Sequence, residues 1–311
     1  MGNTLSKGNL FDPKVSKEII NKVKGHSTIA KLCGAKPIPF NGTKEFTFTM
    51  DKEVDIVAEN GAKSNGGATL APLTIVPIKI EYGARVSDEF LYASEEEALD
   101  ILEAWTEGFA RKAAKGLDLM AFHGVNPRTG AASQIIGTNS FDTNTGVAVV
   151  KFADASNAED ALQNAIDELG EDTNITGFAF SKPFATAMSK VTENGIKVYP
   201  EFKLGGNPGS LNGTACDVNN TVKYAIEGED ADMAIVGDFA GAFKWGVAKD
   251  LPLEIIQYGN PDNDADLGDL KGHNQVYLRS DMYIGWGLLD ASAFARVEDG
   301  EAESGESESG N

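Results

Sequence analysis

The stretch SEEEALDILEAWTEGFARKAAKGLDLMAFHG, Ser94–Gly124, decides how this chain is organised. Ser94 and Glu97 form a capping box, and acidic residues in the first half precede basic residues in the second, as the helix dipole favours. One apolar stripe recurs at spacings of three and four, through Leu102, Trp105, Phe109, Ala113, Gly116 and Met120. We predict a helix over residues 95–122, roughly 40 Å long at about 1.5 Å per residue, that lies across a sheet. We interpret His123 as a cap at its C-terminal end.

Residues 1–38 are typical of an arm. Pro13–Val23 fits a short amphipathic helix that Asp12 caps, with Val15 and Ile19 on one face. A helix this short cannot bury its apolar stripe alone. We therefore expect the arm to dock on another surface.

Residues 39–82 predict a long β-hairpin. In Lys44–Met50 the apolar residues Phe46 and Phe48 alternate with polar ones, and a second extended run, Leu73–Ile80, contains Ile75. The Gly- and Asn-rich residues 60–67 between these runs are typical of a tip. Because an isolated two-stranded hairpin is marginally stable, the body or a neighbouring subunit must cover its apolar face. An ordinary edge hairpin of a sheet is the alternative interpretation.

From about residue 154 the pattern becomes mixed, which gives an α+β chain. We predict helices over Ala158–Leu169, capped by Asn157, and from Ser181 to Asn194-Gly195. Extended runs predict strands at Ile175–Phe180, Val218–Ile226, Met233–Phe239, Phe243–Ala248, Leu253–Tyr258 and Val276–Leu289. The Glu-, Ser- and Gly-rich residues 298–311 are expected to be disordered.

Composition excludes several classes of function. The net charge of −20 repels phosphate backbones, so nucleic-acid binding is not expected as the main activity. No apolar run approaches the roughly 20 residues that cross a bilayer. Cys33 and Cys216 are far apart and predict two free thiols in a reducing cytoplasm.

The chemistry that enzymes need is not apparent in the sequence. The three histidines lack metal-ligand spacing, and no nucleophile elbow or phosphate-binding loop occurs. Asp262, Asp264 and Asp266 resemble a calcium loop, but Gly268 is one place late and His273 replaces the bidentate Glu. We interpret this segment as a solvated acidic turn. No catalytic, cofactor-binding or metal-binding residue is assigned, and we expect no enzyme.

Several segments, taken in order, carry a resemblance to a known family. They are Asp55–Ala62 (DIVAENGA), Ala84–Leu91 (ARVSDEFL), Phe122–Gly124 with Pro127 and Gly130, Gly237–Phe239, Leu251–Glu254, and Arg279 through Asp290 to Phe294. Together with the arm, hairpin and long helix, this order resembles the major capsid proteins of tailed bacteriophages, which have the Hong Kong ninety-seven capsid fold. The resemblance covers roughly residues 10–297.

This resemblance implies a division of the chain: an N-terminal arm (1–38), an extended loop (39–82), a peripheral domain with the spine helix (83–153), an axial α/β domain (154–270), a closing β segment (271–297) and an acidic tail (298–311). It implies assembly residues on the arm and the loop: Val15, Ile19, Phe46, Phe48, Glu59, Lys63 and Ile75. Some relatives join such a lysine covalently to an asparagine of a neighbour, and Lys63 lies in the corresponding region; an exposed lysine without this role is the favoured interpretation.

The implied function is a major capsid subunit that forms hexamers and pentamers of an icosahedral phage head. The head would enclose double-stranded DNA without sequence-specific binding, would be assembled in the host cytoplasm and would involve no membrane. Its partners would be further copies, a portal and a separate scaffolding protein. Two alternatives stay open: an encapsulin-type nanocompartment shell, and an extracellular calcium-dependent binding or hydrolytic protein that uses Asp262–Asp266.

Overall fold

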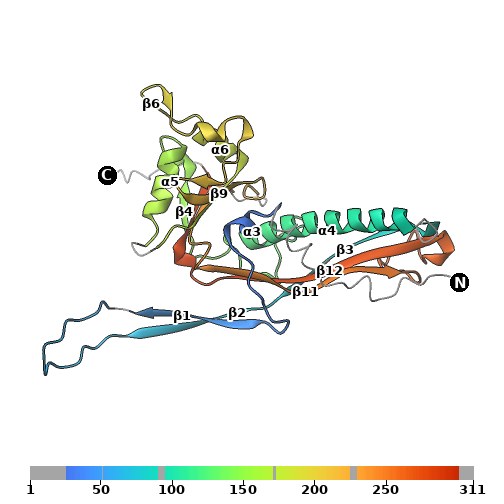
Figure 1. Cartoon of the computed structure of the whole chain (residues 1–311), viewed down its shortest axis with the longest axis horizontal. Helices are drawn as coiled ribbons and strands as arrows, with labels where there is room; N and C mark the ends of the chain where they lie inside the picture. Colours follow the sequence, from blue (N-terminus) through green and yellow to red (C-terminus); the bar gives the residue numbers. More distant parts are fainter. Residues whose placement is uncertain (1–25, 51, 90–94, 171–172, 225–229, 301–311) are drawn as a thin grey trace, which may run out of the picture.

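The computed structural model describes residues 26–50, 52–89, 95–170, 173–224 and 230–300. It is an elongated α+β molecule with three parts: a long sheet with a helix along it, a compact α/β unit at one end, and a projecting β-hairpin (Figure 1). The predicted arm helix with Val15 and Ile19, the capping residue Ser94 and the tail beyond residue 300 lie outside the described residues. Within the described residues, no helix has the length and apolar character needed to cross a membrane.

The long sheet has three antiparallel strands in the order β11-β12-β3. Their bounds are β3 Ile78–Ser87, β11 Phe243–Ile256 and β12 Gln275–Leu288. Alternate residues of β12, including Val276, Leu278 and Met282, are buried, whereas Tyr277 and Arg279 between them are partly exposed. This alternation gives the sheet one apolar face and one polar outer face.

Helix α4, Glu95–His123, confirms the predicted long helix and runs along the apolar face (Figure 1). Trp105 donates a hydrogen bond from Nε1 to Ser280 Oγ at 2.8 Å, and its ring contacts the Tyr82 ring at a tilt of 54°. From Phe109 onward the helix is buried on most sides, because the short helix α3, Thr28–Leu32, and the compact unit cover its second half.

The compact unit is built on a six-stranded mixed sheet in the order β4-β13-β10-β5-β9-β8. Its strands are β4 Ala148–Lys151, β5 Gly177–Phe180, β8 Ser210–Leu211, β9 Thr214–Val218, β10 Ala231–Gly237 and β13 Phe294–Asp299. Helices α5 Ala158–Asp167 and α6 Lys182–Met188 pack against it, and a small hairpin, β6 Thr192–Glu193 and β7 Ile196–Lys197, follows α6. The Asn157 side chain caps α5 as predicted, accepting from two backbone N–H groups.

The projecting hairpin consists of β1 Thr43–Met50 and β2 Ala68–Ile75. The segment that precedes it crosses the outer face of the long sheet, where Lys36 N–H donates to the Trp245 carbonyl at 2.8 Å. A Cβ at Gly246 would lie 1.8 Å from the Lys36 carbonyl oxygen. Only glycine therefore permits this close approach.

Several predicted elements are wrong in extent. The run Leu73–Ile80 is two strands, because Pro77 has no N–H for a ladder and the chain passes from the hairpin to the long sheet between Ile75 and Ile78. The second helix ends at Met188 rather than at Asn194, which forms the β6–β7 turn with Gly195 in left-handed conformations. The predicted strand Val218–Ile226 is wrong in its described part, because β9 ends at Val218 and residues 219–224 form no strand. Conversely, the two runs predicted within residues 243–258 form the single bulged strand β11.

Both the long sheet and the six-stranded sheet combine strands from more than one of the expected segments. Strand β4 lies within 83–153 yet pairs with β13 in the compact unit, and β11 lies within 154–270 yet pairs with β12 in the long sheet. Strand β13 continues to Asp299, two residues into the segment expected to be disordered. Glu298 is fixed there by an ion pair with Lys151 at 2.5 Å.

Candidate assembly surface and junction cluster

The outer face of the hairpin is apolar and uncovered. Residues directly opposite in an antiparallel pair lie on the same face, and the register pairs Phe46 with Pro72, Phe48 with Leu70 and Met50 with Ala68. The Phe46, Met50 and Leu70 side chains are 58%, 71% and 57% exposed. The side chain of Phe48 lies outside the described ones. We call these three register pairs the outer face of the hairpin. Their apolar side chains are available to a partner.

The opposite face attaches the hairpin to the body. Thr47 Oγ1 donates to the Leu289 carbonyl at 2.8 Å, and Glu45 forms an ion pair with Lys244. Ile75 is 1% exposed and packs over Gly285 and Gly287 of the long sheet. The expectation that Ile75 is an assembly residue is therefore corrected: the core of its own chain already covers it.

The hairpin tip, residues 52–67, is exposed at every described position. Val54 and Ile56 are 96% and 97% exposed, and Glu59 and Lys63 lie in the same tip. Lys52 Nζ donates to the Asn65 carbonyl at 2.9 Å and holds the two legs together. The predicted tip residues are thus accessible to another molecule.

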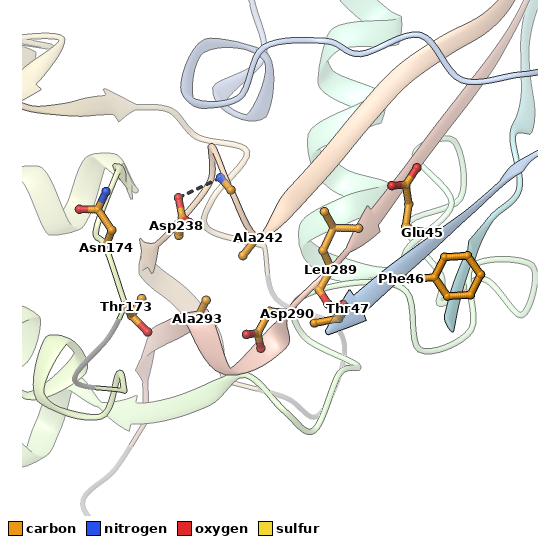
Figure 2. A pocket seen from close by; sticks show the side chains of 11 residues that line it. Glu45, Phe46, Thr47, Thr173, Asn174, Asp238, Ala242, Leu289, Asp290 and Ala293 are labelled. Atoms are coloured by element: carbon orange, nitrogen blue, oxygen red, sulfur yellow. Dashed lines mark hydrogen bonds between the residues drawn. The ribbon is translucent and has the colours of Figure 1, made fainter. Parts of the chain in front are cut away.

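An open groove lies where the hairpin meets the compact unit (Figure 2). Its lining includes Glu45, Phe46, Thr47, Thr173, Asn174, Asp238, Leu289 and Asp290. Its carboxylates already have partners: Asp238 accepts from Thr176 Oγ1 at 2.9 Å, and Asp290 caps the turn at Ser292. The groove therefore lies beside the contacts that attach the hairpin, and its carboxylates are not free to bind a ligand.

A charged cluster lies at the junction between α4 and the compact unit. His123 Nδ1 is 2.8 Å from Asp142 Oδ2 and 3.9 Å from Asp232 Oδ2. Arg296 Nη1 is 3.0 Å from one oxygen each of Asp142, Asp232 and Glu298. We call these five residues the junction cluster. The prediction that His123 only caps α4 is wrong, because its ring is fully buried and joins segments from four parts of the chain.

Burial and the neighbouring Asp142 carboxylate raise the pKa of Asp232 well above its usual value. Asp232 Oδ2 is buried and has no hydrogen-bond partner among the described residues. Charges of this kind are tolerated in a protein interior only when they are paired, and Arg296 supplies most of that pairing.

A second buried carboxylate, Asp118, fastens α3 to α4. It accepts hydrogen bonds from the Ser27 hydroxyl, from the N–H groups of Thr28 and Ile29, and from Thr221 Oγ1. Burial raises its pKa to about 6, and these donors offset only part of that rise. Residues 27–29 are thereby held against α4.

The acidic turn at residues 260–268 is fixed from within the chain. The Asp262 carboxylate accepts hydrogen bonds from Nε and Nη2 of Arg85, at 2.8 and 2.5 Å. This guanidinium lowers the pKa of Asp262 to about 2. Asp264 Oδ1 accepts from the N–H groups of Asp266 and Leu267. Two of the three carboxylates that a calcium loop would use, Asp262 and Asp264, therefore accept hydrogen bonds from an arginine and from backbone N–H groups. Cys33 and Cys216 are buried free thiols, as predicted.

Little of the junction cluster could have been identified from the sequence. Asp142, Asp232 and Arg296 are distant in sequence and come together only through the fold. One local signal was available: Asp118 and His123 are polar residues within the buried end of the α4 stripe. A polar side chain at such a position requires a buried partner.

The comparisons with known proteins identify the class to which these three parts belong, the shell-forming capsid proteins of tailed phages. The family model described as the phage capsid family matches residues 7–299. The chain belongs to the phage capsid family, a structural family whose members form the virion shell, and it is a capsid subunit.

Solved structures show the same fold. A chain from Mycobacterium phage Ogopogo has 30% sequence identity and a TM-score of 0.71, covering 88% of this chain and 92% of that one. A chain from Gordonia phage Cozz has 23% identity and a TM-score of 0.71, covering 89% and 87%. A structure titled "Capsid of empty GTA particle computed with C5 symmetry" has 16% identity and a TM-score of 0.58, covering 89% and 90%. No curated protein sequence matches significantly.

Proposed function

We propose that this chain is the major capsid subunit of a tailed phage and assembles into hexamers and pentamers of an icosahedral head. The observation that carries this proposal is the uncovered outer face of the hairpin in a member of the phage capsid family. In this proposal, the regions around the hairpin, α4 and the compact unit act as extended loop, peripheral domain and axial domain.

Assembly follows from the incomplete burial of the hairpin. Fully burying a side chain such as Phe46 or Leu70 contributes about 1.5–3 kcal/mol. A head-to-tail contact between different surfaces of identical subunits closes into rings when the rotation permits. Because each subunit both gives and receives such a contact, modest interfaces add up over the shell.

The charge suits a container for nucleic acid. A chain with a net charge of −20 does not neutralise phosphates, so its shell would enclose double-stranded DNA without retaining it by sequence-independent binding. The same charge favours solubility of free subunits before assembly in the host cytoplasm. We further propose a portal and a separate scaffolding protein as partners.

The test replaces the apolar outer face while leaving the attachment intact. In the double variant Phe46→Ser with Leu70→Ser, we expect a folded subunit with an unchanged far-ultraviolet circular dichroism spectrum. Particles should be absent in negative-stain electron microscopy at concentrations where the wild type assembles.

The matched control is Phe46→Leu with Leu70→Met, which keeps the apolar character of both positions and should still assemble. Wild-type yields of normal particles from the serine double variant would overturn the proposed role of this face.

A further inference from the structure

The imidazole of His123 has a fixed tautomer. Its Nε2 lies 2.9 Å from the Thr221 carbonyl oxygen, which can only accept a hydrogen bond. Nε2 therefore carries a hydrogen, and in the neutral ring the lone pair is on Nδ1. That lone pair faces the Oδ2 atoms of Asp142 and Asp232. Three electron-rich atoms thus point toward one another, and either a proton or a metal ion between them would offset their repulsion.

Carboxylates outnumber cations around the cluster. Arg296 and Lys151 face the carboxylates of Asp142, Asp232 and Glu298, and Lys151 is shared with Asp230. Asp232 Oδ2 is buried, has no hydrogen-bond partner among the described residues and lies 3.9 Å from His123 Nδ1, so it offers an unused ligand atom.

We propose that His123 Nδ1 and the Oδ2 atoms of Asp142 and Asp232 bind a divalent metal ion of the zinc class. Within the described residues, this group has donor atoms that all lie within 4.8 Å of one another. One imidazole nitrogen with two carboxylate oxygens is a donor set that zinc accepts, whereas calcium and magnesium select oxygen ligands alone.

The supporting contacts are those of a metal site. Ligating histidines usually donate their second ring N–H to a carbonyl or carboxylate, as His123 does to Thr221. The remaining oxygens of the two aspartates accept from Arg296 at 3.0 Å, which orients both carboxylates. The guanidinium therefore holds the ligands from outside and leaves the Oδ2 atoms for the ion.

The ion would tie together the end of α4, the segment that carries Asp142, and strand β10. These are the points where the compact unit joins the long helix (Figure 1). Zinc would thus fix the angle between the two largest parts of the subunit, a role that goes beyond assembly through the hairpin.

The test uses the full-length subunit, loaded with zinc chloride, dialysed and analysed by mass spectrometry for metal content. We expect about one zinc per subunit, as a single closed site requires. Chelation with EDTA should lower Tm by roughly 5 °C or more, and added zinc should restore it. Asp232→Asn should reduce the zinc content at least tenfold.

Asp118→Asn is the matched control, because it removes a fully buried carboxylate of α4 that lies outside the three ligands, and its zinc content should equal that of the wild type. Wild-type protein without zinc after loading, and with a Tm that EDTA leaves unchanged, would overturn the proposal and assign a proton to Nδ1. These wild-type measurements decide the matter even if Asp232→Asn does not fold, and they leave the proposed capsid function untouched.

Discussion

The hairpin and the junction cluster depart from the usual distribution of residues in opposite ways. The outer face of the hairpin exposes Phe46, Met50 and Leu70, whereas the junction cluster buries His123, Asp232 and Arg296. Apolar side chains are normally inside and charged ones outside. The difference shows how the two regions are used: the junction cluster gathers its charged side chains from one chain, and the hairpin leaves its outer face for another molecule.

The largest expected effect comes from removing the shared cation of the junction cluster. Arg296→Met leaves three carboxylates without their guanidinium partner, and we expect the free energy of unfolding to fall by about 3–5 kcal/mol. Urea denaturation followed by tryptophan fluorescence measures this loss. Arg111→Met, which removes an exposed pair with Glu107 on α4, should cost about 1 kcal/mol or less. Equal losses would show that the junction cluster does not hold the two parts together.

The hairpin itself offers a comparison along a single strand. Ile75→Ala removes a buried side chain at the attachment and should cost about 3 kcal/mol, whereas Leu70→Ala, five residues earlier on β2, should cost under about 1 kcal/mol. Thermal or urea unfolding of unassembled subunits distinguishes the two. A large loss for Leu70→Ala would mean that the outer face is already covered in the free subunit.

The sequence predicts best the elements whose signals are local. Helix α4 has a dense stripe and matched charges, and its predicted range is within one residue of the observed Glu95–His123. The alternation of Phe46, Phe48 and Met50 likewise predicts β1. The β6–β7 turn at Asn194-Gly195 was missed although an Asn-Gly pair is a strong signal for a two-residue hairpin. There, a helical interpretation of the preceding residues was extended too far.

The candidate sites likewise could be predicted only where the signal in the sequence is local. The sequence indicates that the hairpin needs another surface to cover its apolar face, because a two-stranded hairpin is only marginally stable alone. The burial of Ile75 could not, because it depends on Gly285 and Gly287, more than 200 residues later. The junction cluster likewise depends on contacts between Asp142, Asp232 and Arg296, which no local pattern encodes.

Stability should also depend on pH through the buried carboxylate of Asp118. The folded-state pKa of Asp118 is raised to about 6, above that of the unfolded chain, so the native state takes up a proton between about pH 6 and pH 4. Ionised Asp118 therefore lowers stability above pH 6, and this cost disappears on acidification. The wild type should gain, relative to Asp118→Asn, on the order of 2 kcal/mol in the free energy of unfolding as the pH falls from 7 to 4.

Urea denaturation of both proteins across this range measures the gain, and the other carboxylates contribute equally to both curves. A constant difference between the two proteins would contradict the raised pKa.

The smallest effect on stability is expected at the hairpin tip. Val54→Ser and Ile56→Ser replace side chains that are almost fully exposed, and each should change the free energy of unfolding of the free subunit by no more than about 0.5 kcal/mol. If the tip contacts a neighbour in the shell, the same substitutions should raise the subunit concentration at which particles appear in light scattering. Unchanged stability with impaired assembly would extend the contrast with the junction cluster to the end of the hairpin. Unchanged stability with normal assembly would confine the contact to the outer face of β1 and β2.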